Sequence, residues 1–123
     1  MAEAPQFIPD ELPILPVRDM VLFPSARMPL TVGRESSLAL LNSLQSEPKL
    51  IGVVTQLDPR VEEPTVADLH KTGTAARIHK MMRLPNGNVV VFLQGLERIR
   101  LLEIVAFRPF LRGRVEVQRD FAG

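Results

Sequence analysis

The strongest structural signal in the chain is Arg83-Leu84-Pro85-Asn86-Gly87-Asn88-Val89-Val90-Val91-Phe92-Leu93. Asn-Gly accepts the positive φ angles of a type I′ turn, so residues 73–84 and 89–93 are predicted to form a β-hairpin. Strict alternation in the first strand would place Ile78, Lys80 and Met82 on one face and His79 and Met81 on the other. Gly95 is expected to bulge or bend the strand that follows the turn.

Further short apolar segments surround this hairpin. Leu12–Val17 contains two prolines, which donate no ladder hydrogen bond, so it is expected to be an edge strand or an extended arm. One helix is predicted over residues 34–46, because Leu38, Leu41 and Leu44 recur every three residues before Pro48. The other expected strands are 28–32, 50–54, 99–105 and 110–117. The pattern predicts a mostly β (α+β) fold of six or seven strands, curled into a sheet or partly closed barrel, with the helix packed at one end.

Composition limits the class of protein. The chain has 123 residues, 46% hydrophobic and 24% charged, which is typical of one globular domain. It contains no cysteine, which excludes disulfides and thiolate metal sites and suits a cytoplasmic setting. No apolar run approaches the roughly 18–20 residues that a membrane span needs. The first residues carry neither the basic nor the apolar region of a signal peptide.

Charge is unevenly distributed along the sequence. Residues 1–76 carry six Lys or Arg and ten Asp or Glu, whereas residues 77–123 carry nine basic and four acidic residues. A basic half of this kind is found in nucleic-acid-binding proteins, so an RNA-binding module is one interpretation. The simpler interpretation is that these arginines are solvated or paired with the acidic half. The absence of Tyr and Trp, which stack on bases, favours the simpler one.

The sequence offers no constellation for catalysis. Its two histidines, His70 and His79, lie in no metal-binding motif, and its seven glycines form no phosphate-binding loop. Its serines lack the G-x-S-x-G elbow. The acidic pair Glu62-Glu63 lies in a polar loop, residues 57–68, where nothing would desolvate a carboxylate. We therefore expect a binding or assembly domain that is not itself an enzyme and that holds no metal or cofactor.

Apolar residues on edge segments and on the hairpin carry the better functional signal. Methionine is flexible and polarisable, which suits surfaces that bind many partners, and an exposed apolar patch is a candidate protein-binding site. The alternative is that each of these residues belongs to the core. The predicted protein-binding surface consists of Val17, Pro24, Met28, Pro29, Met81 and Phe92.

Several motifs, taken together, resemble the N-terminal domain of Lon, the ATP-dependent protease La. The resemblance begins with Leu12-Pro13-Ile14-Leu15-Pro16-Val17-Arg18-Asp19-Met20-Val21-Leu22-Phe23-Pro24 and Met28-Pro29-Leu30-Thr31-Val32-Gly33. It continues with Asp68-Leu69 before Thr72-Gly73-Thr74, with Leu84-Pro85-Asn86-Gly87, and with Gly95-Leu96-Glu97-Arg98. It extends over nearly the whole chain, from residue 11 to about residue 119.

The resemblance implies a PUA-like β domain at residues 12–119, a flexible tail at 1–11, and a truncated end of a longer parent chain at 120–123. It implies that the domain captures unfolded or degron-bearing proteins and helps a homohexamer to assemble. In such a parent, a separate AAA+ module would use ATP and magnesium, and a Ser-Lys dyad in another domain would cut the substrate. The alternatives are a PUA-like RNA-binding module and an oligomerisation scaffold.

Overall fold

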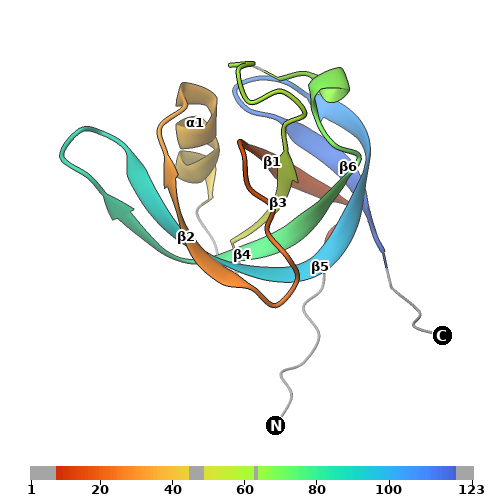
Figure 1. The fold of residues 1–123 in the computed structure, drawn as a ribbon, viewed down its shortest axis with the longest axis horizontal. Coiled ribbons are helices and arrows are strands. Elements are labelled where there is room, and N and C mark those ends of the chain that lie inside the picture. Colours follow the sequence, from red (N-terminus) through yellow and green to blue (C-terminus); the bar gives the residue numbers. More distant parts are fainter. Residues whose placement is uncertain (1–7, 45–48, 63, 119–123) are drawn as a thin grey trace, which may run out of the picture.

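The computed structural model describes residues 8–44, 49–62 and 64–118, and it contains six strands and one α-helix over these residues (Figure 1). The elements are β1 (Glu11–Val17), β2 (Arg27–Val32), α1 (Glu35–Ser43), β3 (Leu50–Thr55), the short 3-10 helix η1 (Val66–Asp68), β4 (Thr72–Arg83), β5 (Val89–Ala106) and β6 (Arg112–Val117). The predicted mostly β fold with one principal helix is confirmed.

The strands form one sheet that closes on itself. Its order is β2-β5-β4-β3-β1-β6, and β5 also pairs with β6, so β1, β3, β4, β5 and β6 make a ring. Only β1 and β3 run parallel to each other; the remaining pairs are antiparallel. β2 pairs with the first part of β5, outside this ring. The predicted barrel is therefore present, with an open flank where β2 lies.

The long strand β5 serves both the ring and the flank. The sequence pattern predicts separate strands at 89–93 and 99–105, but β5 runs without interruption from Val89 to Ala106. It bulges at Leu96, where Ala75 opposes Glu97 and Ala76 opposes Gly95. The expected irregularity beside Gly95 thus bends one strand without ending it. This bend lets the two halves of β5 take different partners.

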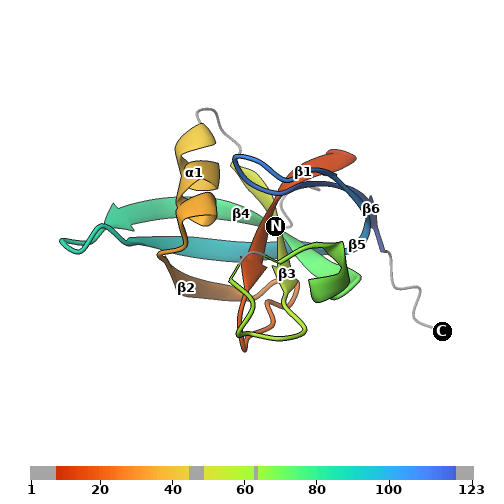
Figure 2. The ribbon, with the colours of Figure 1, turned by 90° about the horizontal axis from the view of Figure 1, so that it is seen from above.

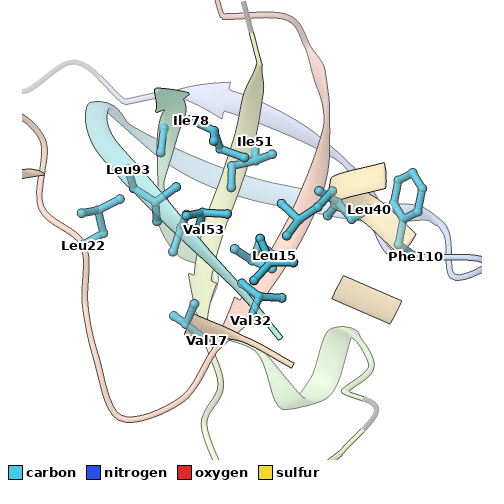
Figure 3. Packing of buried hydrophobic residues seen from close by; sticks show 14 residues of the cluster. Leu15, Val17, Leu22, Val32, Leu40, Ile51, Val53, Ile78, Leu93 and Phe110 are labelled. Atoms are coloured by element: carbon cyan, nitrogen blue, oxygen red, sulfur yellow. The ribbon is translucent and has the colours of Figure 1, made fainter. Parts of the chain in front are cut away.

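Two apolar cores lie on opposite faces of the sheet. The first lies between the sheet and α1, and Figure 3 shows side chains from β1, β3, β5 and α1 pointing toward one another there, among them Leu15, Ile51, Leu93 and Leu40. The second core is built by the alternate residues of the same strands. Its buried members are Ile8, Leu12, Ile14, Leu50, Val54, Leu69, Ala75, Ile99, Leu101, Leu111 and Val115.

The first strand is internal, so its prediction as an edge strand or arm was wrong. β1 pairs with β6 through residues 11–13 and with β3 through residues 14–17. The Ile14 N–H donates to the Leu111 carbonyl on the β6 side at 2.8 Å. The nitrogen of Pro16, two residues on, faces the same side, where the pairing with β6 has ended. Pro16 therefore lies where its missing N–H has no strand to bond. Pro13 pairs with Arg112 of β6 and comes just before the β3 ladder, which begins at Ile14.

The hairpin turn differs from the predicted one. Gly87 donates its N–H to the Leu84 carbonyl at 3.0 Å, and Leu84 donates to the Asn88 carbonyl at 2.8 Å. Only Gly87 in this loop has a positive φ, of 92°, so the turn is not type I′. Pro85 fixes a negative φ at the first central position, which a type I′ turn cannot accept. The loop therefore has three residues and ends on a glycine.

The helix is slightly shorter than expected, and both ends of the chain lie outside the described residues. α1 runs from Glu35 to Ser43, shorter than the predicted 34–46, and Pro48 lies outside the described residues. Of the expected tail, residues 1–7 lie outside the described part, whereas Ile8 is packed in the second core. The predicted domain boundary at residue 12 stays a prediction. Residues 119–123 also lie outside the description.

Candidate functional site

A three-stranded flank projects from the ring, and we call it the wing. It consists of β2, the first part of β5 (residues 89–94) and the second part of β4 (residues 78–83). Figures 1 and 2 both show the β4–β5 hairpin extending past α1, away from the ring. The wing is therefore a small sheet with two faces, and α1 lies next to it.

One face of the wing is covered by α1. Leu40 and Leu41 of the helix share a core cluster with Val91 and Leu93 of β5. At the end of this face, Arg83 donates a hydrogen bond to the Asn42 side chain at 3.3 Å. The opposite face, which we call the open face, carries the side chains that alternate with these.

Cross-strand register identifies the residues of the open face. Pro29 lies opposite Phe92, which lies opposite Lys80 on the other side, and Val90 lies opposite Met82. Met82 is 44% exposed, Pro29 is exposed, and Val90 and Phe92 are half-buried. Four apolar residues from three strands thus form one continuous patch.

A β-bulge at His79 decides which methionine belongs to this patch. Ile78 lies opposite Leu93, but Lys80 lies opposite Phe92, so His79 has no partner in the ladder. This extra residue shifts the alternation by one position. Met81 consequently faces the core and packs against it, while Met82 faces outward. The strict alternation predicted for this strand was wrong beyond Ile78.

The open face is hollowed beside Phe92. A shallow cavity of about 310 Å³ is lined by Arg27, Met28, Pro29, His79, Phe92 and Leu93. His79 contacts the Gln94 side chain through Nε2 at 2.5 Å, which fixes the imidazole beside the cavity. The lining is therefore mostly apolar, with the polar side chains of Arg27 and His79 beside it. Such a surface suits weak binding of an apolar side chain from another molecule.

The structure separates the six predicted surface residues. Pro29 and Phe92 are direct neighbours on the open face. Met28 and Met81 are half-buried against the core beside α1, although Met28 also lines the cavity. Pro24 is half-buried in the loop between β1 and β2. Val17 is 4% exposed and belongs to the first core, so its assignment to an exposed surface is corrected: it packs inward from β1.

Two residues of the open face were not predicted. Met82 and Val90 complete the patch, but the sequence alternation placed Met82 with the buried Ile78. The local sequence gives one indication of the bulge. With a bulge, the two adjacent polar residues His79 and Lys80 can both lie on the solvated side of the sheet. Only the register with β5 settles the choice.

A larger cavity, of about 620 Å³, lies where β1 and β2 end beside the start of α1. Arg34 lines this cavity and donates a hydrogen bond to the side chain of the buried Gln56. Gln56 in turn donates to the carbonyls of Asp58 at 3.1 Å and Val61 at 2.8 Å. The Arg60 guanidinium holds the pKa of the Asp58 carboxyl below its usual value through a hydrogen bond. These contacts hold the acidic loop in place. None of them joins two groups that could act together as a general acid and a general base.

The described residues provide no metal centre. No group of three His, Cys, Asp or Glu side chains that would hold a metal ion is found in residues 8–44, 49–62 and 64–118. Glu62 is exposed, and Glu63 lies outside the described residues. No helix in the described part of the chain is long and apolar enough to cross a membrane.

Part of the basic half of the sequence is paired. Arg112 bonds Glu11 at 2.9 Å, and Arg114 bonds Glu103 at 2.5 Å. These ion pairs join β6 to its two neighbouring strands. Two of the nine basic residues in 77–123 are therefore paired with carboxylates and add little to a positive surface.

Comparison with known proteins agrees with this architecture. A family model described as the ATP-dependent protease La (LON) substrate-binding domain matches residues 11–120. The Lon protease of Koribacter versatilis is 52% identical over 105 residues, which are 85% of this chain and 13% of that protein. The Lon protease of Flavobacterium johnsoniae is 41% identical over 109 residues, which are 89% of this chain and 13% of that protein. The chain therefore spans about an eighth of the length of these relatives.

Solved structures share the fold. The N-terminal domain of Mycobacterium avium complex Lon protease superposes with a TM-score of 0.70 at 19% identity, covering 92% of this chain and 57% of that chain. A Lon N-terminal domain protein from Xanthomonas campestris superposes with a TM-score of 0.68 at 25% identity, covering 89% and 60%. With the family match over residues 11–120, this chain belongs to the Lon substrate-binding domain family.

Proposed function

We propose that this domain captures unfolded or degron-bearing proteins through the open face of the wing, for delivery to the other domains of a Lon protease. The observation that carries the proposal is the patch formed by Pro29, Met82, Val90 and Phe92, beside a hollow of about 310 Å³. Unfolded chains expose apolar segments that folded proteins bury. A shallow apolar surface on a sheet face would hold such segments briefly.

Weak capture is useful when several domains act together. In a homohexamer, six copies of the open face would raise the effective concentration of sites along one substrate chain. We place the hydrolysis of ATP with magnesium in a separate AAA+ module, because the glycines of this chain form no phosphate-binding loop. We likewise place cleavage by a Ser-Lys dyad in another domain. The chain itself would then be a recognition domain of a cytoplasmic protease and not an enzyme.

Titration with a labelled, uncharged unfolded peptide rich in Phe and Leu tests the proposal. The double variant Met82→Ser/Phe92→Ser should bind about tenfold more weakly than the parent domain, because two apolar side chains leave the site. The control variant Leu57→Ser/Phe107→Ser removes two exposed apolar side chains elsewhere and should bind normally. Far-UV circular dichroism checks that both variants fold.

The result also separates the alternatives. Salt-resistant binding that depends on Met82 and Phe92 supports capture, because phosphate contacts weaken steeply as salt rises. Equal losses in the two double variants would remove the open face as the site. Salt-sensitive binding of RNA without peptide binding would favour an RNA-binding module, and self-association without either would favour a scaffold.

A further inference from the structure

A second surface lies on the ring, away from the wing, where β4 begins beside the middle of β5. Thr72 lies opposite Arg100, and Thr74 lies opposite Arg98. Two adjoining hollows, of about 250 and 160 Å³, flank this register, and His70 lines both. We call this surface the basic groove, defined by His70, Lys71, Thr72, Arg98 and Arg100.

The cations of the basic groove outnumber the carboxylates near them. Lys71, Arg98 and Arg100 are all exposed, and none has an ion-pair partner among the residues that the structure describes. In contrast, Arg112 and Arg114 of β6 each bond a carboxylate. Three neighbouring positive charges without partners produce a local positive potential. An anionic ligand would therefore be attracted to this face.

Exposed apolar side chains flank the charges. Val21, from the loop before β2, is 57% exposed and lines the smaller hollow together with Arg98. Leu102 is 46% exposed and lines the larger hollow together with Lys71 and Arg100. The groove thus offers apolar contacts on both sides of its cations. This pattern matches a ligand in which negative charges alternate with apolar groups.

Two acidic residues argue against a continuous polyanion. Glu103 lines the larger hollow, and Glu116 lies directly opposite Arg100 on β6. A phosphate backbone would bring a negative charge close to one of these carboxylates. Apart from the His70 imidazole, no ring that could stack on a base lines either hollow. A protein segment with a few carboxylates fits this environment better than a nucleic acid.

We propose that the basic groove binds an extended acidic segment of a protein chain, in which carboxylates alternate with apolar residues. Lys71, Arg98 and Arg100 pair with the carboxylates, and Val21 and Leu102 contact the apolar side chains between them. The wing contributes no residue to this site. The proposal is therefore independent of capture at the open face, and a failure of either one leaves the other unaffected.

The test uses the whole chain and a short labelled peptide in which every second residue is Glu, with Leu and Ser between. The variant Arg98→Gln/Arg100→Gln should bind this peptide about tenfold more weakly, because two exposed charge pairs are lost. The control Arg18→Gln/Arg108→Gln makes the same change in net charge at exposed positions outside both hollows. It should bind normally, as should Met82→Ser/Phe92→Ser.

Amide resonances of residues 70–74 and 98–102 should shift when the acidic peptide is added. A matched peptide with Gln in place of Glu should cause no such shifts. Equal weakening in the two arginine variants would show a net-charge effect and overturn the proposal, as would normal binding by Arg98→Gln/Arg100→Gln. Tighter binding of a short oligouridine than of the peptide, lost in the same variant, would replace the peptide with RNA as the ligand.

Discussion

Met81 lies opposite the buried Val91 in the β4–β5 ladder, and its side chain packs against the core that α1 covers. Its neighbour Met82 lies opposite Val90 on the open face. Two adjacent methionines therefore have different roles, and the extra residue at His79 is the reason. This arrangement makes them a matched pair for mutation.

The first prediction concerns this pair. Met81→Ser should lower the free energy of unfolding by about 2 kcal/mol, because it removes packed apolar volume from the edge of the core. Met82→Ser should change stability by less than about 0.5 kcal/mol, as is usual at the surface, but should weaken peptide capture. Urea unfolding followed by circular dichroism measures the first quantity. A greater loss of stability in the Met82 variant would contradict the bulge at His79.

The second prediction tests the close approach at Gly95. A Cβ atom there would lie 2.3 Å from the Phe23 carbonyl oxygen, and the Ser25 N–H donates to the Gly95 carbonyl at 2.9 Å. Gly95→Ala must push the loop away from β5 and should cost about 1–3 kcal/mol. Gly33→Ala is the control, because the three atoms nearest to its Cβ would all belong to the Asn88 side chain, which can move aside. Thermal unfolding of both variants should show the larger loss at Gly95.

Local patterns predicted most of the fold because they depend on neighbouring residues. The hairpin, the single helix and the bend at Gly95 follow from turn chemistry, spacing and the lack of a side chain. The place of β1 inside the sheet does not, since it depends on where β3 and β6 stop pairing around Pro13 and Pro16. Local sequence cannot show where a distant partner strand ends.

The candidate site was predictable only in part. Pro29 and Phe92 were selected as apolar residues on exposed strands, and the register joins them directly. Val17 was selected on the same grounds, but both faces of β1 are buried because the ring encloses one and α1 helps to cover the other. The choice between Met81 and Met82 needed the bulge, which arises from pairing with β5. Apolarity identified the candidates, and tertiary pairing decided their exposure.

The third prediction concerns the hairpin loop. Gly87 has a φ of 92°, and a Cβ atom added there would meet nothing within 4 Å, so only backbone conformation restricts this position. Gly87→Ala should therefore cost about 1–2 kcal/mol. Gly87→Asn should cost less, since asparagine tolerates positive φ. Equal losses in the two variants, measured by urea unfolding, would argue against a left-handed residue in this loop.

The fourth prediction concerns Gln56, whose side chain holds three parts of the domain together. It accepts from Arg34 before α1 and donates to the Asp58 and Val61 carbonyls, and its own backbone N–H donates to Val17 of β1 at 2.8 Å. Gln56→Ala leaves the two loop carbonyls without this donor and should cost about 1–3 kcal/mol. Amide hydrogen exchange should rise across residues 57–62, because the loop loses its inner attachment. Arg60→Ala breaks an exposed pair with Asp58 and should leave the free energy of unfolding almost unchanged, because solvent screens such pairs. If both substitutions accelerated exchange equally, the loop would be held by its surface ion pair and not by the buried amide.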